Sequence, residues 1–99
     1  MDVGEPLNLL GLARAAGDHP ASVPGTALSV RCLAGRHLET TPPACWLVVL
    51  DGRLIVDLPH GDFRILERGD ALHLPSGLQV ALQSVEGEAL LLWRSAAGP

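Results

Sequence analysis

The feature that most limits the fold is the stretch of residues 45–82, in which short apolar runs alternate with turn signals. Asp51-Gly52 separates two alternating runs, and such a pair favours a type I′ turn because both central residues of that turn need positive φ. Further clusters of turn residues follow at 58–62, 68–70 and 75–77. Strands this short with turns this close predict an antiparallel meander, not an alternation of strands and helices.

A two-residue turn at Asp51-Gly52 would decide which side chains of its two strands share a face. Successive side chains of a strand alternate between its faces, so pairing Leu50 with Arg53 fixes the register. The inner face is then wholly apolar: Cys45, Leu47, Val49, Leu54, Val56 and Leu58. The outer face carries Arg53 and Asp57 and four large apolar side chains: Trp46, Val48, Leu50 and Ile55. Monomers rarely expose such a cluster, and two-fold pairs are the commonest assemblies, so we predict a homodimer.

The remaining segments predict one short helix and further strands. Leu7, Leu10 and Arg14 follow helical spacing, Pro6 suits a first helical position, and Gly17 ends the pattern. Residues 26–33 alternate and predict a half-buried strand, with Leu28, Val30 and Cys32 on one face and Ser29 and Arg31 on the other. Turns are expected at 35–36 and 86–87, and the apolar run 89–93 predicts a strand buried on both faces.

The glycine and proline spacing of the central stretch resembles the cupin family of small jelly-roll β-barrels. Its second motif, G-x5-P-x-G-x2-H-x3-N, matches at Gly69, Pro75 and Gly77, and Gly52 matches the closing glycine of the first, G-x5-H-x-H-x3,4-E-x6-G. The resemblance implies an all-β fold, a cupin-like double-stranded β-helix (jelly-roll barrel) with a short N-terminal helix or arm. We expect an N-terminal helical arm and loop over residues 1–25, the barrel over 26–95, and a loose tail over 96–99.

The metal ligands that the resemblance would imply are largely missing. The histidine of the second motif falls on Val80, and the glutamate of the first falls on Cys45. The paired histidines fall nearest to His37 and Glu39, and only if the loop to Cys45 is lengthened. A metal site of this kind needs three or four convergent ligands with supporting contacts. We therefore predict a barrel that holds no metal and no other cofactor.

These features predict a non-catalytic barrel that binds or senses a small organic ligand. The expected binding residues lie in the lumen and at its mouth: His37, Glu39, Thr41, Cys45, Leu47 and Val80. One alternative is a metal-dependent enzyme of the dioxygenase or isomerase type that uses His37 and Glu39, which would share a face of a strand. Another is a structural dimerisation module of a regulatory system. A lumen-facing Arg31 that binds a carboxylate or phosphate is a further alternative to an outward one.

The composition of the chain limits the kinds of partner and the location that we expect for it. The net charge is −4, and the 7 basic residues are all arginine and dispersed, which argues against nucleic-acid binding. No apolar run approaches the roughly 18–20 residues of a membrane span, and the first residues are acidic where a signal peptide is basic, so we expect a cytoplasmic protein. Cys32 and Cys45 lack metal-type spacing and are expected to be reduced. We expect Cys45 to be a small buried hydrophobe, and His19, His60 and His73 to point outward.

Overall fold

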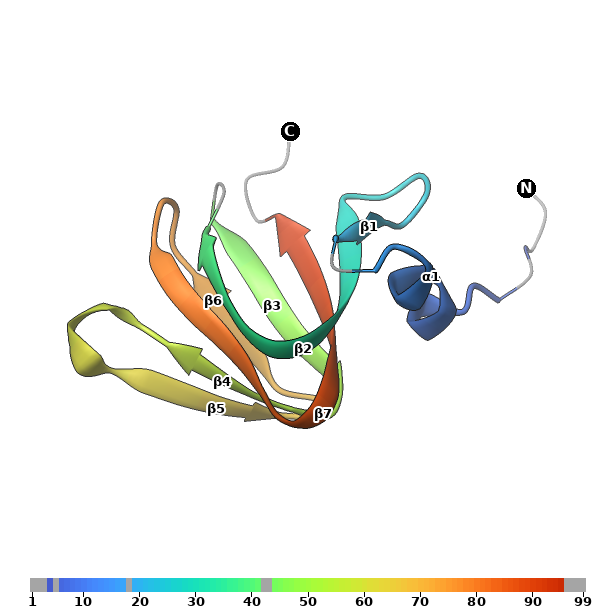
Figure 1. Cartoon of the computed structure of the whole chain (residues 1–99). Coiled ribbons are helices and arrows are strands. Elements are labelled where there is room, and N and C mark those ends of the chain that lie inside the picture. Colours follow the sequence, from blue (N-terminus) through green and yellow to red (C-terminus); the bar gives the residue numbers. More distant parts are fainter. Residues whose placement is uncertain (1–3, 5, 18, 42–43, 96–99) are drawn as a thin grey trace.

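The computed structural model describes residues 4, 6–17, 19–41 and 44–95. It contains one short helix, seven strands and one 3₁₀ turn (Figure 1). In chain order these are α1 (Leu9–Ala15), β1 (Ala21–Ser22), β2 (Leu28–Thr40), β3 (Cys45–Asp51), β4 (Arg53–Asp57), η1 (Pro59–Gly61), β5 (Phe63–Glu67), β6 (Ala71–Leu74) and β7 (Gln79–Ser95). The predicted all-β architecture with a short N-terminal helix is confirmed.

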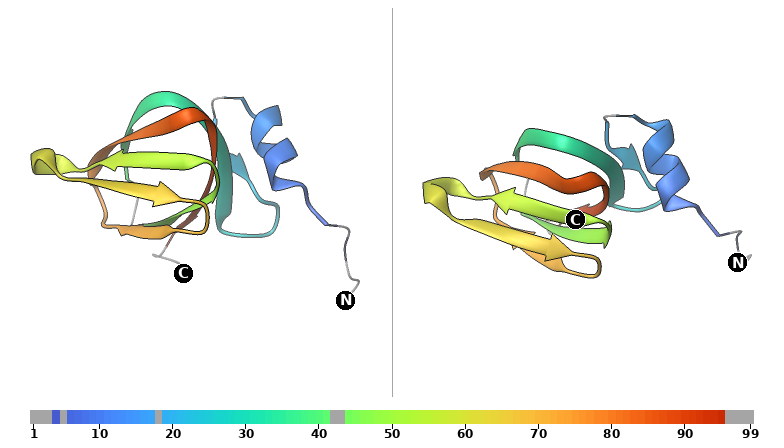
Figure 2. Two further views of the ribbon diagram at one scale, coloured as in Figure 1. Left: turned by 90° about the horizontal axis from the view of Figure 1, so that it is seen from below. Right: turned by 60° about the horizontal axis from the view of Figure 1, so that its bottom comes forward.

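Two long, bent strands organise the barrel. β2 and β7 are antiparallel and pair from Leu28↔Arg94 to Thr40↔Gln79, so each crosses the whole molecule. The end of β7 pairs with β3, which continues to β6, whereas the beginning of β7 pairs with β4, which continues to β5. These two wings curl around a common interior (Figure 2). The strands therefore form a jelly roll held together by long-range pairs, not the meander that the turn spacing predicted.

The prediction of a hairpin at Asp51-Gly52 is wrong. β3 and β4 do not pair with each other: Val49 pairs with Leu91, and Ile55 pairs with Gln83 further back along β7. Gly52 is the corner where the chain passes from one wing to the other. Its φ is +84°, and a Cβ there would lie 2.6 Å from the carbonyl oxygen of Glu88, so no other residue fits without a shift.

The inner face predicted from that hairpin is nevertheless confirmed. Its five members from Cys45 to Val56 are at most 1% exposed, and Leu58 packs against the same cluster. Alternation depends on the number of residues in the corner and not on whether the flanking strands pair. The inner core is completed by side chains of β2, β5, β6 and β7, the buried ones being Leu33, Leu66, Leu74, Val80, Leu82, Ala89 and Leu91.

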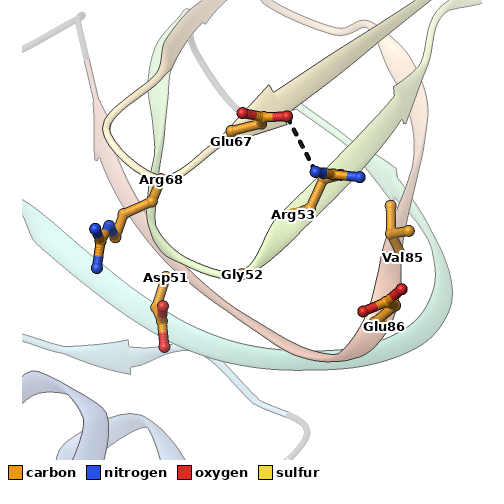
Figure 3. A pocket seen from close by; sticks show the side chains of 7 residues that line it. All are labelled: Asp51, Gly52, Arg53, Glu67, Arg68, Val85 and Glu86. Carbon is orange, nitrogen blue, oxygen red and sulfur yellow. Dashed lines mark ion pairs between the residues drawn. The ribbon is translucent and has the colours of Figure 1, made fainter.

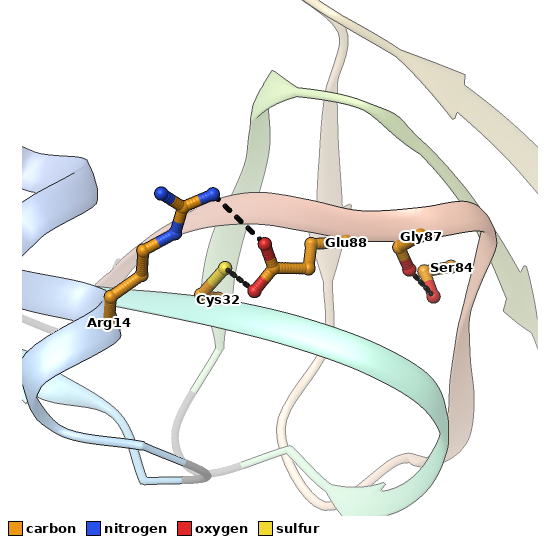
Figure 4. Close-up of polar contacts among 5 residues, drawn as sticks. All are labelled: Arg14, Cys32, Ser84, Gly87 and Glu88. Carbon is orange, nitrogen blue, oxygen red and sulfur yellow. Dashed lines mark hydrogen bonds and ion pairs between the residues drawn. The ribbon is translucent and has the colours of Figure 1, made fainter.

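Two predicted turns are bends within continuous strands. β2 runs through Gly35, where a register shift between Ala34 and Arg36 marks a bulge, and β7 runs through Gly87. Both glycines have positive φ, +81° and +63°. The buried Ser84 hydroxyl links the two bends. It donates to the Gly87 carbonyl at 2.8 Å (Figure 4) and accepts from the Gly35 N–H at 2.9 Å. The ladder between β2 and β7 is interrupted at the bend, between Ala34↔Glu88 and Arg36↔Gln83, and it resumes beyond it.

Helix α1 covers the outer face of β2 and β7 (Figure 1). It begins at Leu9, later than the predicted Pro6, because the Asn8 side chain accepts a hydrogen bond from the Gly11 N–H at 3.0 Å and caps it. A second apolar cluster fills the space beneath the helix; its buried members are Ala13, Val23, Val30, Cys32 and Leu90, and Leu28, Leu50 and Leu92 pack against them. The burial of the 89–93 run on both faces is confirmed, because Ala89 and Leu91 face the barrel while Leu90 faces the helix.

This cover reverses the expected orientation of β2. The apolar face of Leu28, Val30 and Cys32 lies under the helix, so the opposite face, with Arg31, lines the barrel. A hydrogen-bonded cluster ties the helix to the strand: the Cys32 thiol donates to Glu88 at 2.9 Å, and Arg14 donates to the other oxygen of that carboxylate at 3.0 Å (Figure 4). The hydrogen bonds from Cys32 and Arg14 lower the pKa of Glu88, while burial and the carboxylate raise the pKa of Cys32.

The four apolar side chains expected on one outer face do not form one patch. Trp46 is 44% exposed and lies against His73, with ring centroids 5.2 Å apart. Leu50 packs in the cluster beneath the helix, and Ile55 lies on the other wing, paired with Ile65. His19, His60 and His73 are exposed, as predicted. No helix in the described part of the chain is long and apolar enough to span a membrane.

Candidate functional site

A pocket of about 380 Å³ opens at the rim where β2 ends, β3 begins and β7 ends. This rim lies at the top of Figure 1. Its lining includes Ser29, Arg31, Glu39, Thr41, Cys45 and Trp93. The two ends of the bent strand β2 supply most of the polar groups, because the bend at Gly35 returns the strand to the same rim.

Arg31 is the central polar residue of this pocket. It pairs across the sheet with Leu91, which faces the barrel interior, and Arg31 is only 7% exposed. Its Nη1 forms an ion pair with Glu39, and its Nη2 lies 3.3 Å from His37 Nδ1. Its Nε is buried and has no hydrogen-bond partner among the described residues. A buried guanidinium with an unsatisfied N–H is costly and calls for a physical explanation.

His37 is held in one tautomer by these contacts. Its Nε2 lies 3.0 Å from the carbonyl oxygen of Ala34, and a carbonyl can only accept, so Nε2 carries the proton. Its Nδ1 is then free to accept from Arg31 Nη2, which can only donate. The assignment follows from the partners, and it makes His37 a neutral imidazole with both nitrogens engaged.

The predicted site residues divide into three groups. Glu39, Thr41 and Cys45 line the pocket together, and the shared face of His37 and Glu39 is seen in their pairing with Leu82 and Val80. Leu47 and Val80 are 0% and 3% exposed and belong to the packed core. His37 is outside the pocket lining and contacts it through Arg31.

Thr41 and Cys45 have structural contacts that limit their chemistry. The Thr41 hydroxyl donates to the Pro75 carbonyl at 2.6 Å and accepts from the Leu78 N–H at 2.8 Å, so it fastens the end of β2 to the chain before β7. Cys45 is 1% exposed, and burial raises the pKa of its thiol. A protonated thiol is a poor nucleophile, so Cys45 supplies the pocket with a small, weakly polar wall.

Six residues that line this pocket were outside the predicted set: Pro20, Ala27, Ser29, Arg31, Thr40 and Trp93. Arg31 was considered as a lumen residue, but the apolar alternation of Leu28, Val30 and Cys32 favoured the opposite orientation. The signal that could have corrected it is the apolar N-terminal segment, because a helix that must bury leucines needs an apolar outer face to cover.

These residues do not fit the metal that cupin folds often hold. Both ring nitrogens of His37 are engaged, and the Glu39 carboxylate is paired with Arg31. Cys45 and Val80 occupy the positions where the family motifs place a glutamate and a histidine. In the part of the chain that the structure describes, no three His, Cys, Asp or Glu side chains converge. The Arg31 guanidinium bridges His37 and Glu39.

Two other pockets are weaker candidates for a functional site. One of about 390 Å³ surrounds the Gly52 corner, and its charged side chains include Asp51, Arg53, Glu67 and Arg68 (Figure 3). All four are exposed, and Arg53 and Glu67 pair with each other at 3.2 Å. Another of about 370 Å³ lies on the far side of Glu39, between β2, the start of β7 and the end of β4. Neither contains a buried, unsatisfied polar group.

Comparison with protein-family models finds no match, and comparison with curated proteins finds none. Solved structures are similar. Protein NMB1881 from Neisseria meningitidis has 20% identity and a TM-score of 0.73, over 93% of this chain and 100% of that one. A protein of unknown function from Rhizobium leguminosarum bv. viciae has 24% identity and a TM-score of 0.70, over 93% of this chain and 95% of that one.

A cupin-2 domain containing protein from Shewanella frigidimarina is similar over 78% of this chain and 79% of its own, with 13% identity and a TM-score of 0.63. Identities this low establish the fold alone. The chain is therefore a small cupin-fold protein, and the expectation raised by Gly69, Pro75 and Gly77 is confirmed at that level. Its function must be argued from its own side chains.

Proposed function

We propose that this cupin-fold chain is a non-catalytic barrel that binds a small organic ligand in the rim pocket between β2, β3 and β7. The observation that carries the proposal is Arg31, a buried cation with an unsatisfied Nε in the wall of that pocket. A buried polar group without a partner calls for an explanation, and a bound group that completes its hydrogen bonds is one such explanation.

The size and lining of the pocket support a small ligand. Pockets that hold small molecules usually have volumes of about 300–1,000 Å³ and combine apolar walls with a few polar groups. A volume of about 380 Å³ lies near the lower limit of that range. Trp93 and Cys45 supply weakly polar surface, while Arg31 and Glu39 supply orientation.

Binding without catalysis is favoured because the pocket offers no activated nucleophile. Burial raises the pKa of the Cys45 thiol, and the Thr41 hydroxyl is committed to backbone partners. A general base would need a free acceptor beside one of these groups. The nearest imidazole, His37, uses both nitrogens for Arg31 and Ala34. A metal-dependent enzyme that uses His37 and Glu39 would first have to break the contacts of these two residues with Arg31.

The two tryptophans provide a direct test. Trp93 lines the pocket, whereas Trp46 lies on the outer surface against His73. A library of small organic fragments would be screened at millimolar concentration by the two indole N–H signals in ¹H–¹⁵N spectra. We expect some fragments to shift the Trp93 signal while leaving Trp46 in place. If no fragment moves Trp93, or if all that do also move Trp46 equally, the pocket is not a binding site.

We also infer that the chain forms a homodimer, which the exposed apolar side chains support. Phe63 and Ile65 on β5 are 55% and 53% exposed, and Leu38 on β2 is 77% exposed. A mass of twice 10.4 kDa by light scattering is expected at micromolar concentration, and a mass of 10.4 kDa would refute the dimer. Two variants distinguish the wings as the dimer contact. Ile65→Glu should weaken the dimer if the wing of β4 and β5 forms the contact, and Trp46→Glu should weaken it if the wing of β3 and β6 does.

A further inference from the structure

We propose that the rim pocket selects ligands whose head group carries a hydrogen-bond donor beside an acceptor and no net charge, such as a primary carboxamide. This inference rests on the proposed binding function and names the class of ligand. It follows from the charges and the free hydrogen-bonding positions of Arg31 and Glu39.

The polar wall of the pocket is electrically balanced. Arg31 and Glu39 are paired, so their charges cancel, and His37 beside them is held as a neutral imidazole by Ala34 and Arg31. The Glu39 side chain is 33% exposed, whereas that of Arg31 is 8% exposed. An anionic ligand would therefore approach the carboxylate before the guanidinium, and two carboxylates in a partly desolvated site repel each other.

The same pair leaves donors and an acceptor free. The Arg31 guanidinium has five N–H groups and uses two of them, one on Glu39 and one on His37. Arg31 retains its Nε–H, which no described residue accepts. Glu39 contacts Arg31 through Oε1, and no hydrogen bond to its Oε2 is found among the described residues. A carboxamide offers a carbonyl oxygen for a free N–H of the guanidinium and an N–H for Oε2, so it can satisfy a donor and an acceptor of the pair at once. A carboxylate can satisfy only the donor, and an ammonium only the acceptor.

The apolar remainder of the lining favours a compact hydrophobic body behind that head group. Trp93, Pro20 and Ala27 are apolar members of the lining, and none of them carries a charge. Burial of such a body supplies most of the affinity of small ligands, while the head group fixes orientation. A single benzene ring is a suitable probe because it fits the volume and leaves the head group as the only variable.

The test compares four probes that share this ring: benzamide, benzoate, benzylammonium and benzyl alcohol. Dissociation constants would be measured on the wild-type chain from the Trp93 indole shift, with Trp46 as the internal reference. We expect benzamide to bind at least about tenfold more tightly than benzoate or benzylammonium, with benzyl alcohol between them. Tighter binding of either charged probe would overturn the inference and leave the binding function intact. If no probe moves Trp93, both fail.

A charge change in the wall gives a second, independent readout. Glu39→Gln removes the negative charge but keeps a carbonyl oxygen for Arg31, so the site gains a net positive charge. Benzoate affinity should then rise by about tenfold, while benzamide affinity should fall, because the Gln amide nitrogen that replaces Oε2 cannot accept the N–H of the carboxamide. Glu67→Gln is the matched control, since it makes the same change in an exposed ion pair with Arg53, outside the pocket. An equal gain of benzoate affinity in both variants would overturn the inference.

Discussion

The neighbouring strands β2 and β7 face the same lumen with opposite chemistry. Across their ladder, Glu39 pairs with Val80, and Arg31 pairs with Leu91. The β7 members are 3% and 0% exposed and fully apolar, whereas β2 supplies an ion pair. Strand pairing alone therefore does not determine what a lumen position contains.

The difference follows from the position of each strand in the barrel. β7 lies between β2 on one side and β3 or β4 on the other, so its inner side chains are enclosed by the core. Both ends of β2 border the rim pocket, where its polar groups can reach each other and the opening. A charge is tolerated where it has a partner and partial solvent access, and excluded where it has neither.

The largest expected effect comes from placing a charge on the apolar strand. Val80→Asp should lower the free energy of unfolding by several kcal/mol, which is comparable with the total stability of a small domain, about 5–15 kcal/mol. Thermal or denaturant unfolding would measure it. Gln79→Asp is the control, because residue 79 is exposed on the other face of β7, and its effect should be within about 0.5 kcal/mol. Equal melting of the two variants would contradict the assignment of residue 80 to the inner face and residue 79 to the outer face.

A smaller loss of stability is expected when the Arg31 cation is removed from β2. Arg31→Met should cost about 1–3 kcal/mol, because Glu39 loses its partner but retains partial access to water. The double variant Arg31→Met/Glu39→Gln should recover part of this loss in a double-mutant cycle. Arg14→Met is the control, since it breaks an exposed pair with Glu88 and should cost less than about 1 kcal/mol. Strict additivity of the two changes would mean that the ion pair does not stabilise the fold.

The Cys45 thiol lies on the apolar side of the rim. We expect its ionisation to make the folded protein modestly less stable at alkaline pH. Burial raises the pKa of this thiol above its ordinary value, so the folded state favours the protonated thiol. Its contribution to the free energy of unfolding is complete at pH values below the pKa of the thiol in the unfolded state. This contribution is lost as the pH rises towards the pKa of the thiol in the folded state, at a slope of at most about 1.4 kcal/mol per pH unit. Unfolding free energies measured from pH 8 to 11 should therefore decline less steeply for Cys45→Ala than for the wild type. Parallel declines would refute this role.

No measurable change is expected when metal is withheld or supplied. Because Arg31 occupies the contacts that His37 and Glu39 could give to a metal ion, we predict no stoichiometric zinc, iron, manganese or nickel in the purified protein. Elemental emission spectroscopy would check this. The prediction would be contradicted if the protein held one metal ion per chain and His37→Ala lost it. His37 and Glu39 would then bind a metal ion in place of their contacts with Arg31.

Much of the fold could be predicted from local patterns, and less of the site. The inner set from Cys45 to Leu58 followed from alternation, and Val80 was correctly placed in the core. Arg31 could not be oriented, because a strand whose alternate face is apolar can bury that face against either the lumen or a covering helix. Thr41 and Cys45 were found in the pocket, but the engagement of Thr41 by Pro75 and Leu78 depends on distant segments.

By itself, the sequence determined which residues alternate, where glycine is needed and which family motifs are degenerate, since these depend on neighbours along the chain. Only the tertiary structure decided that Asp51-Gly52 is a corner between wings, that α1 covers the apolar face of β2, and that Arg31 bridges His37 and Glu39. The physical reason is that burial is a property of the assembled barrel. A face becomes interior or exterior only when a distant segment covers it, and a buried charge finds its partners only when a bent strand folds back on itself.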